Sequence, residues 1–115
     1  MIITIITNDP AYGTERTFNA LRLALALLKD ESIQLKFFLM ADGVTCALKG
    51  QDTPAGYYNL ERMLKRVADK GEVRACITCM KARGIPEEYF IPGVEAGDMA
   101  LLADWIKISD KVISF

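Results

Sequence analysis

The chain has 115 residues, a length at which one domain buries a sizeable core, and we expect a single domain over 1–115. Its formal net charge is −1 and its acids and bases are interspersed, which excludes the clustered Lys and Arg of a nucleic-acid-binding protein. There is no histidine, so Ser–His and Cys–His catalytic pairs and the commonest metal ligand are excluded as well.

The first part of the chain predicts a strand, a helix and a second strand. Residues 2–7 are β-branched and apolar on both faces, which is typical of a strand covered from both sides. Thr14 is placed to cap a helix over 15–29, with Glu15 in the first turn where the helix dipole favours an acid. That helix is apolar almost all round, so we expect its own sheet on one side and something else on the other. Residues 33–40 predict the second strand.

The middle of the chain predicts a long connection, a helix and a short strand that leads into two cysteines. The connection contains Gly and Pro and has one helical turn near 44–48. Residues 59–70 repeat apolar side chains with the helical period, which indicates an amphipathic helix. We expect a strand over 73–75 and a brief basic helix from Cys76 to about Arg83.

The last third predicts a short strand near 93–95, a helix over 98–108 that is apolar on two sides, and a final strand over 111–115. Alternating strands and helices indicate right-handed crossovers, a parallel sheet and helices on both of its faces. Apolar residues make up 51% of this small chain, which indicates that some apolar surface lies in subunit interfaces. We therefore expect an α/β fold in a homo-oligomer.

Two cysteines fall at the edge of this sheet where α/β proteins bind ligands. Parallel strands place their carboxyl ends at one edge, and three connections are expected there: residues 8–13, 42–46 and 76–84. The third contains CITC, with Cys76 and Cys79 three residues apart. The cysteine pair is therefore expected at the functional edge.

A metal site is the weakest interpretation of this pair. Structural zinc requires four Cys or His ligands, whereas the chain has one pair, a distant Cys46 and no His. An iron–sulfur cluster fails on the same count. We expect no metal and no cofactor, and we interpret Cys46 as structural.

Thiol chemistry and simple burial both remain open for Cys76 and Cys79. Free cysteines are usually small buried hydrophobes. A thioredoxin-type dithiol opens a helix after a strand, as this pair does, although the other spacing elements of that fold are missing. Helical spacing places Arg83 on the face of both cysteines, where its charge would stabilise an anionic sulfur.

The loop NDPAYGTERT has two interpretations. It superficially resembles the phosphate loop of a flavodoxin, but it lacks the GK[ST] of a P-loop and the chain is short for a flavin domain. We interpret it as a tight turn with a helix cap. Backbone N–H groups at Gly13 and Thr14 are expected to contribute to an anion-tolerant pocket near Cys76.

The sequence shows no sign of export or membrane insertion. No apolar run approaches the roughly 18 residues of a membrane helix. The opening MIITIIT lacks a basic segment and a cleavage site, so we interpret it as a strand and not as a signal peptide. Three cysteines are an odd count, which fits poorly with a disulfide-stapled secreted domain. We expect the cytoplasm, where thiols stay mostly reduced.

Four segments occur in order along the chain: NDPAYGTERTFNALRLALAL, FFLMADGVTCALKGQ, CITCMKARGI and GVEAGDMALLADWIKISDKVISF. Together they resemble the DsrE/TusD family of small sulfur-relay proteins, and most closely its YchN-like branch. The resemblance spans nearly the whole chain. It implies a three-layer α/β/α sandwich around a parallel five-stranded sheet, and assembly as trimers or hexamers.

The resemblance also implies a role for Cys76. In sulfur-transferring members a cysteine after the third strand carries a persulfide and precedes an Arg-Gly pair. Cys76 is followed by Arg83 and Gly84 at the family's spacing, so the resemblance implies a sulfurtransferase that exchanges sulfur with donor and acceptor proteins. Cys79 is typical of the YchN-like branch, where it would release the sulfur or form a disulfide with Cys76.

Two other functions remain open. One is a non-enzymatic oligomeric binding protein, in which Cys76 merely lines a pocket for a small anion or a partner. The other is a thiol redox sensor, in which Cys76 and Cys79 form a reversible disulfide.

Overall fold

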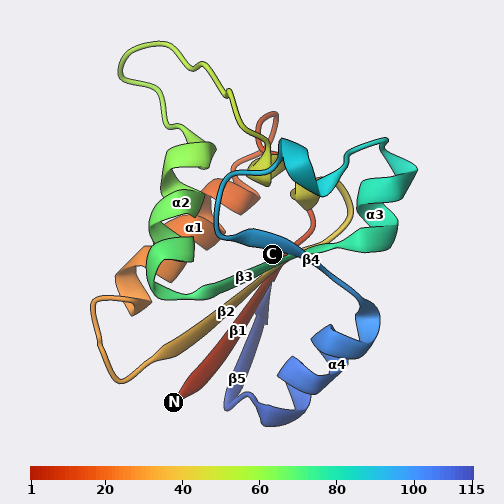
Figure 1. Ribbon diagram of the computed structural model, residues 1–115. Helices are drawn as coiled ribbons and strands as arrows, with labels where there is room; N and C mark the ends of the chain where they lie inside the picture. Colours follow the sequence, from red (N-terminus) through yellow and green to blue (C-terminus); the bar gives the residue numbers. More distant parts are fainter.

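A sheet of five parallel strands runs through the centre of the protein (Figure 1). A computed structural model describes all 115 residues. The strand order is β4-β3-β2-β1-β5. The strands are β1 (Ile2–Thr7), β2 (Gln34–Leu39), β3 (Glu72–Cys76), β4 (Val94–Gly97) and β5 (Lys111–Ser114). β1 lies inside the sheet between β2 and β5, as its apolar residues on both faces predict.

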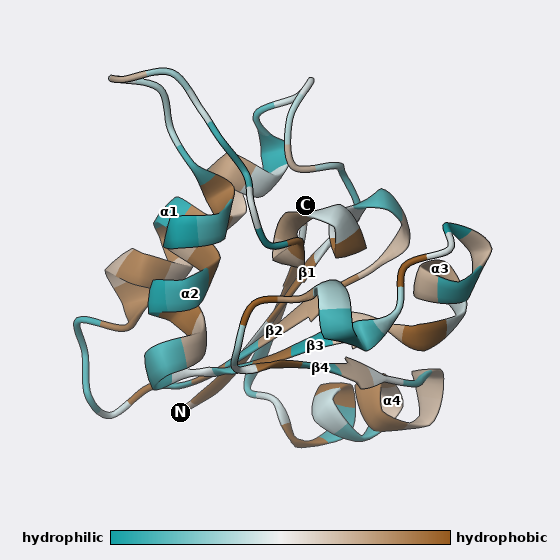
Figure 2. Cartoon of the chain, turned by 45° about the horizontal axis from the view of Figure 1, so that its top comes forward, coloured by the Kyte–Doolittle hydropathy of each residue, from teal (hydrophilic) through white to brown (hydrophobic).

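Helices cover both faces of the sheet, which confirms the three-layer α/β/α sandwich. The α-helices are α1 (Arg16–Leu27), α2 (Leu60–Lys70), α3 (Ile77–Ala82) and α4 (Met99–Ile108), and the 3₁₀ helices are η1 (Ala41–Ala47) and η2 (Glu87–Tyr89). Helices α1 and α2 lie side by side on one face, and α4 lies on the other (Figure 1, Figure 2). None of these helices has the length and apolar character of a membrane span.

Two element boundaries differ from the predicted ones in ways that shape the carboxyl edge. The third strand continues through Cys76, because that residue pairs with Gly97 of β4. The single predicted turn near 44–48 is part of a longer 3₁₀ helix, η1, that starts directly after β2 at Ala41. Both changes bring the two cysteines and η1 to the same edge of the sheet.

The prediction that Thr14 caps the first helix is wrong. The helix begins at Arg16, so the N-cap position belongs to Glu15, whose side chain makes no capping hydrogen bond. The Thr14 hydroxyl instead donates to the Asp9 carboxylate at 2.8 Å. A carboxylate is a charged acceptor, so this hydrogen bond is a strong one, and it ties Thr14 to the loop.

Helix α1 is covered by the sheet on one side, and the element that covers its other side belongs to the same chain. The α1 residues Ala20, Leu21 and Ala24 are buried, and α2 packs alongside α1. Phe18 stacks on Tyr58, which lies in the connection that leads into α2, with ring centroids 4.1 Å apart. The sheet, α2 and this aromatic pair together cover α1 on two sides, while Leu23, Leu25 and Leu27 stay partly exposed.

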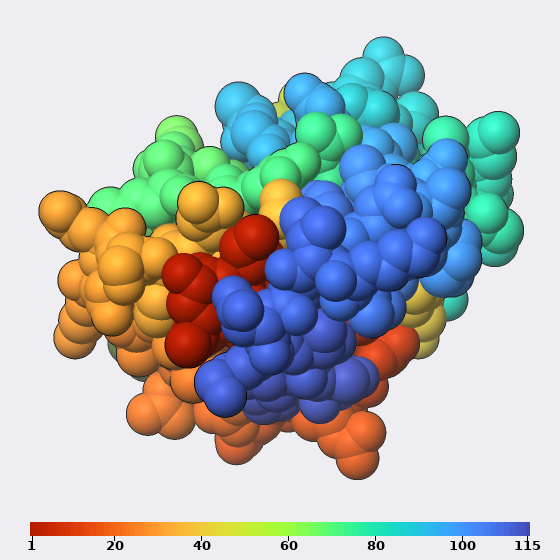
Figure 3. All heavy atoms as spheres, turned by 90° about the horizontal axis from the view of Figure 1, so that it is seen from below, coloured from red at the N-terminus to blue at the C-terminus, as the bar shows by residue number.

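Helix α4 is covered on one side only. Leu102 and Trp105 are buried against the sheet, where Trp105 meets Phe38 edge-on at 5.9 Å between ring centroids. The space-filling view from below shows the C-terminal segment on the surface beside the first residues of the chain (Figure 3). The large apolar side chains exposed on α4 and β5 are Met99, Ile106, Ile108 and Val112.

Candidate functional site

Cys76 lies where β3 ends and α3 begins, at the carboxyl edge of the sheet. It occupies the N-cap position of α3, and its Sγ accepts a hydrogen bond from the Cys79 N–H at 3.5 Å. Gly84, in the left-handed region with φ 66°, follows the end of this short helix. Only 5% of Cys76 is exposed, so its sulfur is largely covered.

Cys79 lies one helical turn further on in α3, half-buried on the side that faces η1. Its Sγ accepts a hydrogen bond from the Ala41 N–H at 3.2 Å. Burial raises the pKa of the Cys79 thiol above its ordinary value, and the Cys76 side chain raises it further; the Ala41 hydrogen bond and the Arg83 charge act in the opposite direction. Cys79 is therefore a protonated thiol at neutral pH.

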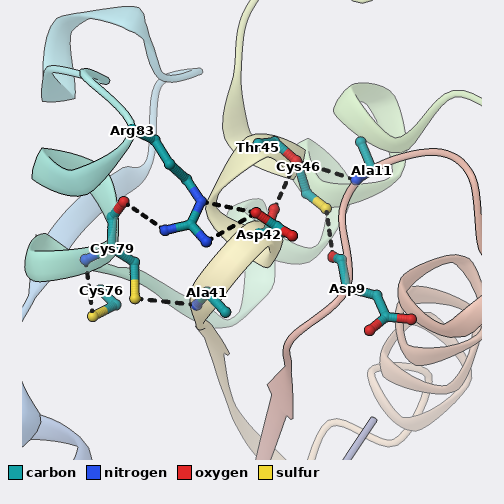
Figure 4. A network of polar contacts seen from close by, with 9 residues as sticks. All are labelled: Asp9, Ala11, Ala41, Asp42, Thr45, Cys46, Cys76, Cys79 and Arg83. Carbon is teal, nitrogen blue, oxygen red and sulfur yellow. Dashed lines mark hydrogen bonds and ion pairs between the residues drawn. The ribbon is translucent and has the colours of Figure 1, made fainter.

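The Arg83 guanidinium bonds to oxygen atoms of neighbouring residues in the site. Its Nε and Nη2 both lie 2.9 Å from Asp42 Oδ1, and its Nη1 donates to the Cys79 carbonyl oxygen at 3.0 Å (Figure 4). None of its hydrogen bonds reaches a sulfur atom. The charge of Arg83 is thus largely neutralised by Asp42, which weakens its direct effect on the thiols.

The backbone at the start of η1 is held in an unusual conformation. Ala41 has φ 53°, and it is the only residue other than glycine in the left-handed region. Two residues later, a Cβ on Gly43 would lie 2.5 Å from the Thr7 carbonyl oxygen. η1 therefore packs directly on the end of β1, and this packing directs the Ala41 N–H toward Cys79.

Gly13 and Thr14 lie in a different part of the carboxyl edge. Both are exposed, and Thr14 bonds to Asp9, which lies across η1 from the two cysteines (Figure 4). This loop meets η1 on its other side, where the Ala11 N–H donates to the Thr45 hydroxyl at 3.2 Å. The structure thus brings Cys76, Cys79 and Arg83 together, and it places the loop of Gly13 and Thr14 apart from them.

Cys46 lies inside the core on η1 and is fully buried. Burial raises the pKa of its thiol to about 12, and its Sγ lies 4.0 Å from the Asp9 carbonyl oxygen, at the long limit of a sulfur hydrogen bond. A thiol with this pKa has almost no thiolate at neutral pH. Its environment agrees with the structural interpretation of Cys46.

Two site residues, Ala41 and Asp42, were missed at the level of the sequence. The connection over 42–46 was expected at the carboxyl edge, but no role was assigned to its side chains. A signal existed, because an acidic residue directly after an apolar strand is placed to pair with a cation on a neighbouring loop. The partner, Arg83, lies 41 positions away and could not be identified from spacing.

The protein is thus an α/β/α sandwich with two neighbouring free thiols at the carboxyl edge of a parallel sheet. The particular family follows from comparison with known proteins. The chain belongs to the DsrE/DsrF-like family, whose model matches residues 1–115.

Individual relatives agree with this assignment. Protein YchN of Escherichia coli is 44% identical over 115 residues, covering 98% of this chain and 97% of YchN. The crystal structure of the E. coli YchN protein matches with a TM-score of 0.91 over 98% of this chain and 97% of that one. Sulfurtransferase TusD of Cronobacter sakazakii is 25% identical over 128 residues, covering 100% of both chains.

Proposed function

We propose that this protein carries sulfur as a persulfide on Cys76 and passes it from a donor to an acceptor. Membership of the DsrE/DsrF-like family supports the proposal, and so does the similarity to a protein named sulfurtransferase. The observation that carries it is the position of Cys76. It is the last residue of a strand at the carboxyl edge of a parallel sheet, with a second thiol one helical turn away.

The chemistry is an exchange between sulfur nucleophiles. The Cys76 thiolate attacks the outer sulfur of a donor persulfide R–S–SH, the S–S bond of the donor breaks, and the donor leaves as R–S⁻. Cys76 becomes Cys76–S–SH, with the proton retained on the outer sulfur. An acceptor thiolate attacks that outer sulfur in turn and regenerates the Cys76 thiolate. Neither step requires histidine, which this chain lacks.

Sulfur loading tests this proposal. The wild-type chain is incubated with a cysteine desulfurase and cysteine, its intact mass is measured, and the tryptic peptide 75–81, which holds both site cysteines, is fragmented. We expect a gain of one sulfur atom on Cys76 and none on the buried Cys46, which serves as an internal control. An unchanged mass with all thiols free would contradict sulfur carriage from this type of donor.

A thiol redox sensor is the second candidate function. It is favoured by the closeness of the two free thiols, since the Cys76 sulfur accepts the Cys79 N–H. A mild oxidant would then produce a reversible Cys76–Cys79 disulfide, seen as the loss of two hydrogen atoms. That loss without sulfur uptake would favour the sensor, and a chain that shows neither change would be assigned to the non-enzymatic binding proteins.

We also propose that the protein assembles as a trimer or hexamer in the cytoplasm, through the apolar surface of α4 and β5. Met99, Ile106 and Ile108 are exposed there although they are large and apolar. Analytical ultracentrifugation is expected to show an oligomer in the wild type and dissociation in Ile106→Glu. Ala26→Glu, on α1 across the sheet, is the matched control, and a monomeric wild type would contradict the proposal.

A further inference from the structure

An ion pair connects η1 to the residue that follows α3, beside the two cysteines (Figure 4). Asp42 lies at the start of η1, and Arg83 directly follows α3. Arg83 contacts the Asp42 carboxylate through two nitrogen atoms at 2.9 Å. No other ion pair joins these two elements, so this pair alone links them by charge.

Cys79 is consequently held at two points. Its carbonyl oxygen accepts a hydrogen bond from Arg83, and its sulfur accepts one from Ala41, the residue before Asp42. Figure 4 shows the Cys79 sulfur directed at Ala41, while the Cys76 sulfur faces the Cys79 N–H. The ion pair thus fixes the spacing between the two elements that hold the Cys79 backbone and the Cys79 sulfur.

This restraint matters because Cys79 is the nearest nucleophile to a persulfide on Cys76. If the Cys79 thiolate attacks the inner sulfur of Cys76–S–SH, the Cys76–Cys79 disulfide forms and the outer sulfur leaves as HS⁻. The Cys79 sulfur is oxidised to the disulfide level and the outer sulfur is reduced to sulfide, while the Cys76 sulfur keeps its oxidation state, so no further reagent is required. Each such event discards one carried sulfur.

We propose that Asp42 and Arg83 are positioning residues that hold Cys79 away from this attack and so protect the sulfur carried on Cys76. The inference rests on the proposed function. An attacking sulfur must approach in line with the S–S bond that breaks. A Cys79 sulfur that accepts the Ala41 N–H must give up that hydrogen bond before it can turn into line. The raised pKa of Cys79 acts in the same sense, because it keeps the thiolate scarce.

Sulfide release from the loaded protein tests the proposal. Wild type and Asp42→Asn are loaded with sulfur, separated from the donor, and followed by sulfide assay and by intact mass. Loss of an exposed ion pair shifts a local opening equilibrium about two- to fivefold, and we expect sulfide release to accelerate by that factor. The Asp42 side chain is 58% exposed, so the variant is expected to fold. Arg83→Gln breaks the pair from its other end but also removes a charge that lowers the pKa of Cys79, so we expect a smaller acceleration in the same direction.

Two controls separate positioning from general loosening of the fold. Asp104→Asn makes the same chemical change in an exposed ion pair on α4, where Asp104 lies 3.8 Å from Lys107, and is expected to release sulfide at the wild-type rate. Asp42→Asn combined with Cys79→Ser is expected to lose the acceleration, because the internal nucleophile is gone. Unchanged release in both Asp42→Asn and Arg83→Gln, or an acceleration that persists without Cys79, would overturn the proposal.

A second readout needs no carried sulfur. Oxidised glutathione is added to the unloaded protein, and formation of the Cys76–Cys79 disulfide is followed by mass; Asp42→Asn is expected to form it faster than wild type by the same factor. Faster disulfide formation in a protein that never loads sulfur would support the positioning role and reject persulfide carriage. Normal loading with no change in either rate would reject the positioning role alone.

Discussion

The Cys76→Ser variant is expected to take up no sulfur, whereas Cys79→Ser is expected to load like the wild type. A serine hydroxyl at neutral pH supplies no thiolate for attack on a donor persulfide, so the effect should be all or none. The fold should survive, because serine is among the best N-cap residues and keeps an acceptor for the Cys79 N–H at the start of α3. Intact mass after incubation with a desulfurase and cysteine measures both variants.

Cys46→Ala is the control for this experiment. Cys46 is fully buried on η1, and its removal is expected to leave sulfur uptake unchanged while costing about 1 kcal/mol of stability from the small cavity. Uptake that persists in Cys76→Ser and maps to Cys79 would reverse the assignment of carrier and neighbour. Uptake that disappears in Cys79→Ser would instead mean that both thiols are needed.

The Gly43→Ala variant is expected to lose about 3 kcal/mol of unfolding free energy, at the upper end of what overpacking usually costs. The added Cβ would lie 2.5 Å from the Thr7 carbonyl oxygen and 3.2 Å from its carbonyl carbon. Both atoms belong to the backbone of β1, which is paired on two sides within the sheet. The strand cannot yield, so η1 must move, and the Ala41 N–H moves with it.

Urea unfolding measures this loss, and Gly56→Ala is the matched control. Gly56 has φ 82°, and a Cβ added there would meet no atom within 4 Å, so the variant carries only the conformational cost of the left-handed region, about 1 kcal/mol. The difference between the two variants isolates the steric contribution. A loss in Gly43→Ala no larger than in Gly56→Ala would show that η1 is not held against β1.

Much of the architecture could be predicted because it follows from local patterns. The apolar run over 2–7 predicts β1 with the bounds it has, and the helical period over 59–70 predicts α2, which begins after its Asn59 cap. Thr14 shows where such reasoning fails. Several polar residues stand in the loop before α1, and spacing alone did not show that the helix begins at Arg16 or that the Thr14 hydroxyl donates to the Asp9 carboxylate.

Cys76 could be placed from the sequence at the junction of a strand and a helix on the carboxyl edge of a parallel sheet, because periodicity and strand–helix alternation are properties of neighbouring residues. That the strand itself extends through Cys76 depends on its pairing with Gly97 of β4. The groups that surround that cysteine could not be identified before the chain was folded. The expected Arg83 is near, but its charge is directed to Asp42, and the N–H that reaches Cys79 comes from Ala41. These contacts join segments about forty positions apart, and their geometry exists only once η1 has packed on β1.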